Sequence, residues 1–575
     1  MVTMRSLTKY RTLVLVLIIA AGIAAAWLYW SRAPLSDLAA WAPDDSLAYT
    51  EVNDLGSLVE GVQQTVAWKS LGPLLGAPPS LAPNRWVVRL ARWTGIGSPD
   101  AILFARSQVA VVLSGAEGSQ SGSTLIIKPL LTLIVETHTS QRRMRGAIEQ
   151  HLEDTARQDF GNPVIVRKQV EGVELQEWQS EDGTRRIVAS FINTTVVIGN
   201  DEAAVLHSVA AGTGRRPALH NQTEFEQTRR ANSSASTAIF GFVSQPGVKS
   251  LLQAFALNTQ SHGTVSSDAI TGARLFADTF GAIVKQVGWS ARFTNGAVED
   301  HCSVILADGV TDKLRVSMAP DRGPDLTQLP FAPPGVQSVS IYSFHDSAGV
   351  WNDLNAVVSS HADLVGAIAA RPVMRSLLSA YGISDADSFA RGIGTHLQTI
   401  RAEEGSPAVL VGEVFDRPAI EKGFAARFGR DPKTEKFGAA DLIIAPDTWT
   451  AAFVQNSFLL GPGEDVRRSL QAYANGQSIS TTQAFREAQR FVDISLPLTA
   501  VTFTNDARAA VSFVDAFSHE GRSAFSTNAA AISEASNALP LAMSALIVKE
   551  GRFEWTSRSS FGIGGAVATN LLPEK

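Results

Sequence analysis

Four consecutive residues near the middle of the chain, Glu299 to Cys302, carry side chains that can bind metals or move protons. They read Glu-Asp-His-Cys, and carboxylate, imidazole and thiolate groups are all metal ligands. Successive side chains of a strand point to opposite faces, so a strand here separates Asp300 and Cys302 from Glu299 and His301. Neither face then holds three ligands. We therefore expect a half-buried strand in which Cys302 acts as a small apolar residue.

Two histidines lie close in sequence to an aspartate and could form a general base with an orienting carboxylate. These pairs are His345 with Asp346 and His361 with Asp363. His361 belongs to an Ala- and Val-rich stretch, 357–370, that we expect to be helical. Residues two apart on a helix point away from each other. A solvated polar face is therefore the favoured interpretation of the second pair, and a catalytic dyad is the alternative.

Two predicted strand-to-helix turns offer backbone N–H groups that could bind an anion. Their sequences are Gly199-Asn200-Asp201 and Gly461-Pro462-Gly463. Acidic residues follow at once, Glu202 in the first turn and Glu464-Asp465 in the second. Carboxylates at the start of a helix interact with its N-terminal dipole and repel an anionic ligand. We therefore expect ordinary helix starts here rather than phosphate sites.

The sequence motifs of several common enzyme classes are missing from the chain. It has no Gly-x-x-x-x-Gly-Lys-Ser/Thr, no His-Glu-x-x-His and no complete Gly-x-Gly-x-x-Gly after a predicted strand. The segment Gly118–Gly122 has the outline of a nucleophile elbow, but Gln120 stands where the nucleophile is required. Paired acids such as Asp44-Asp45 and Glu403-Glu404 are typical of turns, and a glycosidase pair is recognised only by its distances. The sequence therefore assigns no catalytic residue, no cofactor-binding residue, no metal ligand and no cofactor.

Composition narrows the class of protein further. The chain has 575 residues, with 49 Lys and Arg against 55 Asp and Glu, and a net charge of −6. This acidic balance offers no electrostatic footprint for a phosphate backbone, so we expect no nucleic acid partner. Hydrophobic residues make up 45% of the chain, which is enough to bury large cores. Cys302 is the single cysteine, which excludes an internal disulfide and cysteine-rich metal sites.

Residues 13–30 predict a transmembrane helix that anchors the protein in a lipid bilayer. The segment LVLVLIIAAGIAAAWLYW has 18 residues without a charge, and its helix is about 27 Å long against roughly 30 Å of hydrocarbon. Three cationic residues precede it, so the basic tail, 1–12, is expected in the cytoplasm. A signal peptide cleaved after Ala24-Ala25-Ala26 is the alternative. The uncleaved anchor is favoured because the apolar run continues into aromatics. Both interpretations export the bulk of the chain, to the periplasm or the cell surface.

The exported part reads as an internal duplication. After a juxtamembrane linker, 31–42, a first unit covers 43–317, a Pro-rich linker covers 318–334, and a second unit covers 335–575. Similar segments follow in the same order in both units, with gaps between them. They are Tyr49 with Tyr342, Gly95–Arg106 with Gly382–Arg391, Phe191–Gly199 with Phe453–Gly461, and Trp289–Gly296 with Met543–Gly551. Chance does not usually preserve order across so many blocks.

Each unit mixes strand and helix patterns. Ile187–Ile192 and Val196–Ile198 predict a hairpin, and Asn295-Gly296 predicts a second one. In both units a strand leads to a helix that starts after a good N-cap residue, Ser140 or Asp416. We therefore predict an α+β fold of two similar tandem units, each an antiparallel sheet with helices on one face, after one N-terminal transmembrane helix.

The start of the first unit resembles a known family. Residues 43–54, Pro-Asp-Asp-Ser-Leu-Ala-Tyr-Thr-Glu-Val-Asn-Asp, follow a single predicted span, as in the bacterial domain of unknown function 3352. The hairpin that ends around 196–206, Val-Ile-Gly-Asn-Asp-Glu-Ala-Ala-Val-Leu, is similar to a strand–Gly–helix segment of that family. The resemblance covers most of the exported part and rests on loose structural motifs. It implies a membrane-anchored bacterial protein outside the cytoplasm, and it brings no catalytic residues.

Three functions fit these features. The first is non-catalytic binding of a protein or lipid partner, with Val248–Ala256 and Ala509–Phe517 as apolar helices that could line a groove, although core packing is the favoured role for both. The second is a structural protein of the envelope, which a large exposed apolar patch would indicate. The third is a hydrolase assembled only in three dimensions, which a pocket of acids or histidines with shifted pKa values would indicate.

Overall fold

The computed structural model describes residues 35–75, 107–121, 124–260, 267–326, 329–361, 378–379, 381–403, 405–518 and 529–565. Three features of the sequence lie outside them: the predicted transmembrane helix 13–30, the segment Gly95–Arg106, and Asp363. Among the residues described, none forms a helix that is both long and apolar enough to cross a bilayer.

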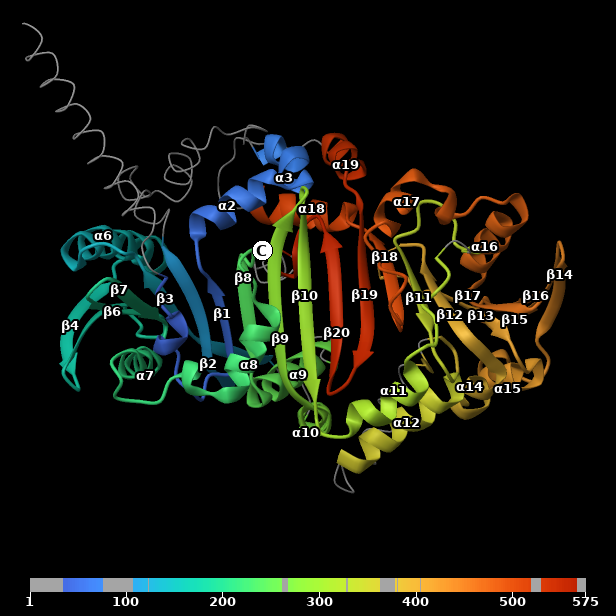
Figure 1. Ribbon diagram of the computed structural model, residues 1–575, viewed down its shortest axis with the longest axis horizontal. Helices are drawn as coiled ribbons and strands as arrows, with labels where there is room; N and C mark the ends of the chain where they lie inside the picture. Colours follow the sequence, from blue (N-terminus) through green and yellow to red (C-terminus); the bar gives the residue numbers. More distant parts are fainter. Residues whose placement is uncertain are drawn as a thin grey trace, which may run out of the picture.

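The N-terminal half, residues 35–318, contains the strands β1 to β10 (Figure 1). Its strands are β1 Ala48–Val52, β2 Gln108–Ser121, β3 Thr124–Glu136, β4 Val164–Val170, β5 Val173–Gln179, β6 Arg186–Ile192, β7 Thr195–Gly199, β8 Ile239–Val243, β9 Val284–Thr294 and β10 Ala297–Leu306. Its helices are α2 Leu55–Gln64, α3 Val66–Leu71, α6 Gln141–Phe160, α7 Glu202–Gly212, α8 Thr223–Asn232, α9 Gln245–Gln260, α10 Ser267–Ile283 and α11 Val310–Met318.

The C-terminal half, residues 329–565, contains β11 to β20. Its strands are β11 Ser338–Ser343, β12 Ile393–Arg401, β13 Val409–Val414, β14 Lys433–Phe437, β15 Ala440–Ile444, β16 Trp449–Val454, β17 Ser457–Pro462, β18 Ala500–Asn505, β19 Leu541–Lys549 and β20 Arg552–Ser559. Its helices are α12 Ser347–His361, α14 Ala386–Gly392, α15 Arg417–Phe428, α16 Gly463–Asn475, α17 Gln483–Gln489, α18 Ala507–Ser518 and α19 Ala529–Asn537.

All the described strands form one antiparallel sheet of 20 strands, so the α+β prediction is confirmed. From one edge the strands lie in the order β4-β5-β6-β7-β3-β2-β1-β8-β9-β10. From the other edge the order is β14-β15-β16-β17-β13-β12-β11-β18-β19-β20. The two orders agree strand for strand, and the pairing of β10 with β20 joins them in the middle of the molecule (Figure 1).

Helices cover both faces of the outer strands, so the prediction of helices on one face is wrong. In the N-terminal half, α6 packs on the face that carries Trp178 and Ala189, and α7 packs on the face that carries Leu175 and Val188. In the C-terminal half all six residues of β16 are buried. Strands buried on both faces have near-continuous apolar runs instead of alternation, and Trp449–Val454 is such a run with Thr450 as its one polar residue.

Local turn chemistry explains where several elements begin and end. Asn295 and Gly296 have φ values of 48° and 77°, the left-handed conformation that both central residues of a type I′ turn require, and the predicted β9–β10 hairpin forms. The β6–β7 hairpin also forms as predicted. Asp416 caps α15 by accepting a hydrogen bond from the N–H of Ala419. Ser140 occupies the N-cap position of α6 without a side-chain bond.

The strand ladders show which residues of the two halves occupy the same place. The N–H of Leu47 bonds to the C=O of Leu113, and the N–H of Gln337 bonds to the C=O of Arg401, at the start of the first strand in each half. Counting two residues on from Leu47 and from Gln337 reaches Tyr49 and Val339. The sequence match of Tyr49 with Tyr342 is therefore wrong by three residues, which also places the two tyrosines on opposite faces.

Part of the predicted Pro-rich linker, 318–334, belongs to the core of the C-terminal half. Ala332 is fully buried, and its C=O accepts a 2.8 Å hydrogen bond from the N–H of Ile479. The same bond occurs in the N-terminal half, where the N–H of Leu219 donates to Ala42 over 2.8 Å. Both halves thus begin with a short buried segment just before their first strand.

Candidate functional site

The Glu-Asp-His-Cys sequence lies on β10, at the junction of the two halves. Its side chains alternate between the two faces of the sheet, as expected. Asp300 is 2% exposed and accepts hydrogen bonds from Trp289 Nε1 at 3.0 Å, Ser557 Oγ at 3.2 Å and the N–H of Ile563 at 3.1 Å. Burial raises the pKa of Asp300, and these three donors oppose that shift. Asp300 therefore fastens the segment after β20 to β10.

Cys302 shares a face with Asp300. Burial, reinforced by the charge of Asp300, raises the pKa of the Cys302 thiol to about 11. A thiol with such a pKa is protonated at neutral pH, whereas nucleophiles and metal ligands are thiolates. Within the described ranges, no group of three or more His, Cys, Asp or Glu residues is arranged to hold a metal ion.

His301 lies on the opposite face, between the two halves. Its Nδ1 is 3.0 Å from Oδ1 of Asn232 at the end of α8, and its Nε2 is 4.0 Å from a carboxylate oxygen of Glu554 on β20. Burial lowers the pKa of His301, and Glu554 acts in the other direction. The side chain keeps 32% of its surface exposed. It can therefore contact a partner as well as the two halves.

Two glutamates on this face each bind two cations. Glu299 is 2.5 Å from Arg558 and 2.8 Å from Arg292. Glu554 is 2.5 Å from Lys549 and 2.7 Å from Arg552. Burial raises the pKa of Glu554, but hydrogen bonds from its two cations outweigh burial and hold the pKa below its ordinary value.

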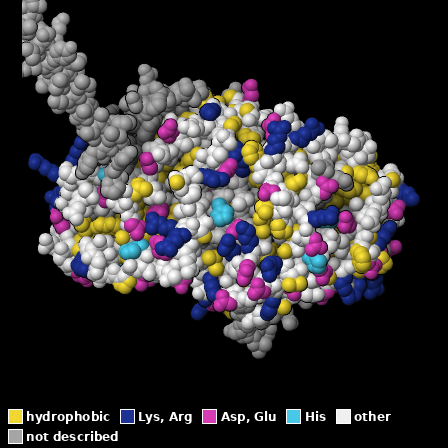
Figure 2. All heavy atoms as spheres, viewed as in Figure 1, with side chains coloured by type: hydrophobic (Ala, Val, Ile, Leu, Met, Phe, Trp, Pro, Cys, Tyr) yellow, Lys and Arg dark blue, Asp and Glu magenta, His cyan; other side chains and the backbone are white. Residues whose placement is uncertain are grey.

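We call this group of residues the central charged face. It consists of Arg292, Glu299, His301, Lys549, Arg552, Glu554 and Arg558. Four cations stand against two carboxylates, so the face carries a surplus of positive charge although the whole chain is acidic. In Figure 2, side chains of both signs are intermixed in the middle of the molecule, over β10 and β20. The cations keep 41% to 53% of their side chains exposed except at Arg558, where the value is 12%.

Exposed apolar side chains adjoin the central charged face. Phe491, Ile494 and Leu496 lie in the loop between α17 and β18 and are 50%, 57% and 40% exposed. The guanidinium carbon of Arg558 lies 3.9 Å from the centroid of the Phe491 ring, which is a cation–π contact. Phe491 of this loop therefore adjoins the central charged face.

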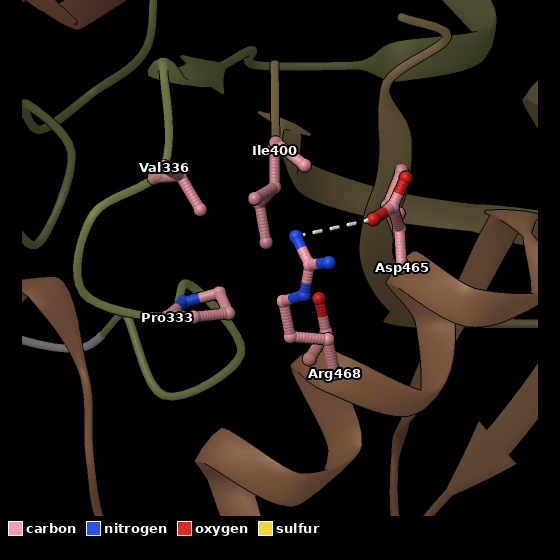
Figure 3. Close-up of a pocket in the computed structure, with 8 residues that line it drawn as sticks. Pro333, Val336, Ile400, Asp465 and Arg468 are labelled. Atoms are coloured by element: carbon pink, nitrogen blue, oxygen red, sulfur yellow. Dashed lines mark ion pairs between the residues drawn. The ribbon is translucent and has the colours of Figure 1, made fainter.

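The C-terminal half contains a small hollow (Figure 3). Its apolar wall includes Pro333, Val336 and Ile400, and the ion pair of Asp465 with Arg468, 3.5 Å apart, closes one side. The empty volume is about 180 Å³ including open solvent, while ligand pockets commonly hold roughly 300–1,000 Å³. The hollow is too small to be a binding site for a drug-sized ligand.

The other sequence candidates do not assemble into sites. Nδ1 of His345 is 3.5 Å from Asp321, while Asp346 accepts a hydrogen bond from the N–H of Ala348. For His361, only the backbone is described. At the first candidate anion turn, Asp201 itself caps α7 by accepting from the N–H of Ala204. Glu464 and Asp465 of the second turn both pair with Arg468.

Sequence reasoning missed a buried polar cluster on β1. Glu51 is 2% exposed and accepts hydrogen bonds from the hydroxyl of Tyr49 at 2.7 Å and from Arg229 at 3.1 and 3.2 Å. Arg229 also donates to Asp37 at 2.9 Å. Because Glu51 and Arg229 are 178 residues apart in the sequence, no local spacing reveals the pair. A glutamate at an inward position of an alternating strand is the signal that was available.

Comparisons with known proteins give little support for any function. No protein family matches the sequence, and no curated protein matches it. The crystal structure of TP0453 in crystal form I is similar over 48% of this chain and 81% of that chain, with 9% identity and a TM-score of 0.23. A likeness this weak carries no argument.

Proposed function

We propose that this protein is a membrane-tethered, non-catalytic binding protein outside the cytoplasm, and that it binds a protein partner through the central charged face and the adjoining loop. The observation that carries the proposal is the combination of exposed cations with exposed apolar side chains on one surface. Interfaces with partners use apolar and arginine side chains of this kind. Among the described residues, the buried carboxylates of Glu51, Asp300 and Asp506 accept internal hydrogen bonds.

The tether is residues 13–30, with 1–12 in the cytoplasm and 31–42 as the connection. The fold supports a short connection, because Asp37 is already bonded to Arg229 and the N–H of Ser36 is bonded to Gln108. Ser36, six residues after Trp30, is therefore already attached to the folded part. A protease added to intact and to permeabilised cells tests the orientation. Cleavage of the folded part in cells whose inner membrane is closed is expected.

The folded part consists of two related units, 43–317 and 335–575, joined through 318–334. The agreement in strand order and the matching bonds to Ala42 and Ala332 support a common origin. In this proposal the central charged face is built at the junction because each unit contributes its last hairpin there. A partner then contacts both units at once.

The alternative is a structural protein of the envelope. The exposure of Phe491, Ile494 and Leu496 favours it, since exposed apolar clusters mark contacts between proteins. Under both functions the surface binds a protein. A binding protein exchanges its partner, whereas a structural protein keeps it permanently. The dissociation rate of the complex distinguishes the two functions.

The test is capture of partners by the full-length chain in detergent, with and without charge reversal. The variant Arg292→Glu with Lys549→Glu reverses two exposed cations of the face. Lys436→Glu, at a position whose side chain is 84% exposed on β14, is the matched control. Partners retained by the native chain and by the control, but lost from the double variant, are expected. An unchanged set of partners in all three proteins contradicts the proposal.

A further inference from the structure

The pairing of β10 with β20 has the geometry of a two-fold axis. Gly296 and Gly551 occupy the same turn position in the β9–β10 and β19–β20 hairpins. Five residues after them come His301 and Thr556, and these two face each other across the junction. Two strands that meet at equivalent residues in antiparallel pairing form a self-complementary contact, as in a symmetric dimer.

Residues on either side of that centre obey the same rule. Glu299 faces Arg558, and Ser303 faces Glu554. Counted from the two turns, Glu299 and Glu554 are equivalent, and so are Ser303 and Arg558. On both strands, therefore, the third residue after the turn faces the seventh residue after the other turn. Such reciprocity defines an isologous interface.

Helices repeat the reciprocity away from the strands. Leu71 of α3, in the N-terminal half, packs with Val514 of α18 and Ile532 of α19 in the C-terminal half. Val357 of α12, in the C-terminal half, packs with Ile283 of α10 in the N-terminal half. In each half, a helix between the first and second strands thus packs on helices that precede the last hairpin of the other half. Figure 1 shows these two contacts at opposite ends of β10 and β20.

We infer that the chain is a dimer of homologous halves fused into one polypeptide, and that its junction is a self-sufficient protein–protein interface. The partner that fits the central edge of each half is a second copy of the same fold. This inference goes beyond the proposed function, because it concerns what holds the molecule together. The covalent connection between α11 and β11 is then dispensable once the molecule has folded.

Charge pairing disfavours pairing of the N-terminal half with itself. If β10 paired with a second β10 about His301, Glu299 would face Ser303 and lose Arg558. In the molecule, Glu299 and Arg558 are 2.5 Å apart with side chains 21% and 12% exposed. Opposite charges directly across an antiparallel pair are stabilising. The Glu299–Arg558 pair therefore favours mixed pairing over pairing of the N-terminal half with itself.

The first experiment cleaves the connection in the folded, full-length chain. A specific protease site is inserted between Asp321 and Arg322, where the chain crosses between the halves and Asp321 is 87% exposed. After cleavage, the two fragments are expected to elute together from gel filtration at the volume of the uncut protein and to separate only in denaturant. Separation of the fragments under native conditions overturns the inference.

The second experiment tests the register without relying on the inserted site. His301→Cys with Thr556→Cys, in a Cys302→Ala background, places two thiols directly opposite, and mild oxidation is expected to link them. His301→Cys with Glu554→Cys is the control, since diagonal positions are too far apart for a disulfide. Linkage in the control and not in the opposed pair contradicts the two-fold register.

Discussion

The inward faces of β1 and β11 occupy the same place in the two halves but differ in chemistry. On β1 they carry Tyr49 and Glu51, and the Glu51 carboxylate accepts hydrogen bonds from the Tyr49 hydroxyl and from Arg229. On β11 the same positions hold Val339 and Ile341, which are 0% and 3% exposed in an apolar core. Both halves nevertheless form the same strand order. The buried charges are therefore not needed for this fold, in keeping with the modest net value of buried ion pairs.

The difference gives the N-terminal half an additional contact. Arg229 bonds at once to Glu51 and to Asp37, which lies just before the buried segment that opens the fold. The cluster thereby fastens the stretch of chain nearest the proposed tether. We interpret the buried charges as a specific attachment of the N-terminal segment.

The largest expected effect comes from breaking the cluster at one side. Arg229→Leu leaves Glu51 buried without its cation, which costs about 3–5 kcal/mol of unfolding free energy. Urea titration of the full-length chain in detergent, followed by tryptophan fluorescence, measures it. Arg230→Leu is the control, because that side chain is 80% exposed and its loss should change little. Equal losses in the two variants contradict this role for Arg229.

Replacing the buried polar cluster by the residues found at the same positions of the C-terminal half should restore most of the lost unfolding free energy. Phe225 and Phe485 are both fully buried at the same place of α8 and α17, and four residues on stand Arg229 and Gln489. The variant Tyr49→Val, Glu51→Ile, Arg229→Gln thus copies the other half. We expect a smaller loss of unfolding free energy than in Arg229→Leu, because no charge stays buried without a partner, while Tyr49→Val contributes the cost of a cavity. A loss as large as in Arg229→Leu contradicts the comparison.

Substitutions in the Glu299–Arg558 pair at the junction should have an intermediate effect on the unfolding free energy. Glu299→Arg places like charges opposite each other at Arg558, and we expect a loss of about 1–3 kcal/mol, the range of hydrogen bonds to charged groups. Adding Arg558→Glu restores an opposite-charge pair and should recover a large part of the loss. A double-mutant cycle by urea titration measures the coupling. Additive losses with no coupling show that the pair does not stabilise the junction.

The smallest expected effect is a change in how the free energy of unfolding depends on pH when Asp300 is replaced. Burial raises its pKa above 3.8 in the folded chain, so the folded state binds the proton more tightly than the unfolded state. The resulting stability is complete below pH 3.8 and is lost as pH rises through the folded-state pKa. Asp300→Asn removes this dependence. The difference in unfolding free energy between native chain and variant should therefore shift in favour of the variant from pH 4 to pH 7, and a constant difference would falsify it.

Much of the fold could be predicted from local patterns. The turn at Asn295-Gly296 and the cap at Asp416 depend on a few neighbouring residues, and both formed as expected. The register of Tyr49 could not be predicted, because a match of similar residue types does not fix which face a strand buries. Helices on both faces were missed because alternation was assumed where Trp449–Val454 is apolar except at Thr450.

The candidate site was less accessible to sequence reasoning. The sequence identified Glu299 and His301 and placed them on one face, because strand alternation is a local property. It gave no sign of Arg558 or Glu554, since Glu299 and Arg558 are 259 residues apart. Those partners make the expected half-buried strand part of a network of ion pairs.

By itself, the sequence determined the alternation of helices and strands and the alternate faces of β10, because backbone preferences and side-chain periodicity act over a few residues. Only the tertiary structure decided that β10 meets β20 at His301 and Thr556, which brings six charged side chains together around His301. Contacts across hundreds of residues depend on the packing of the whole sheet, and no short stretch of sequence encodes that packing.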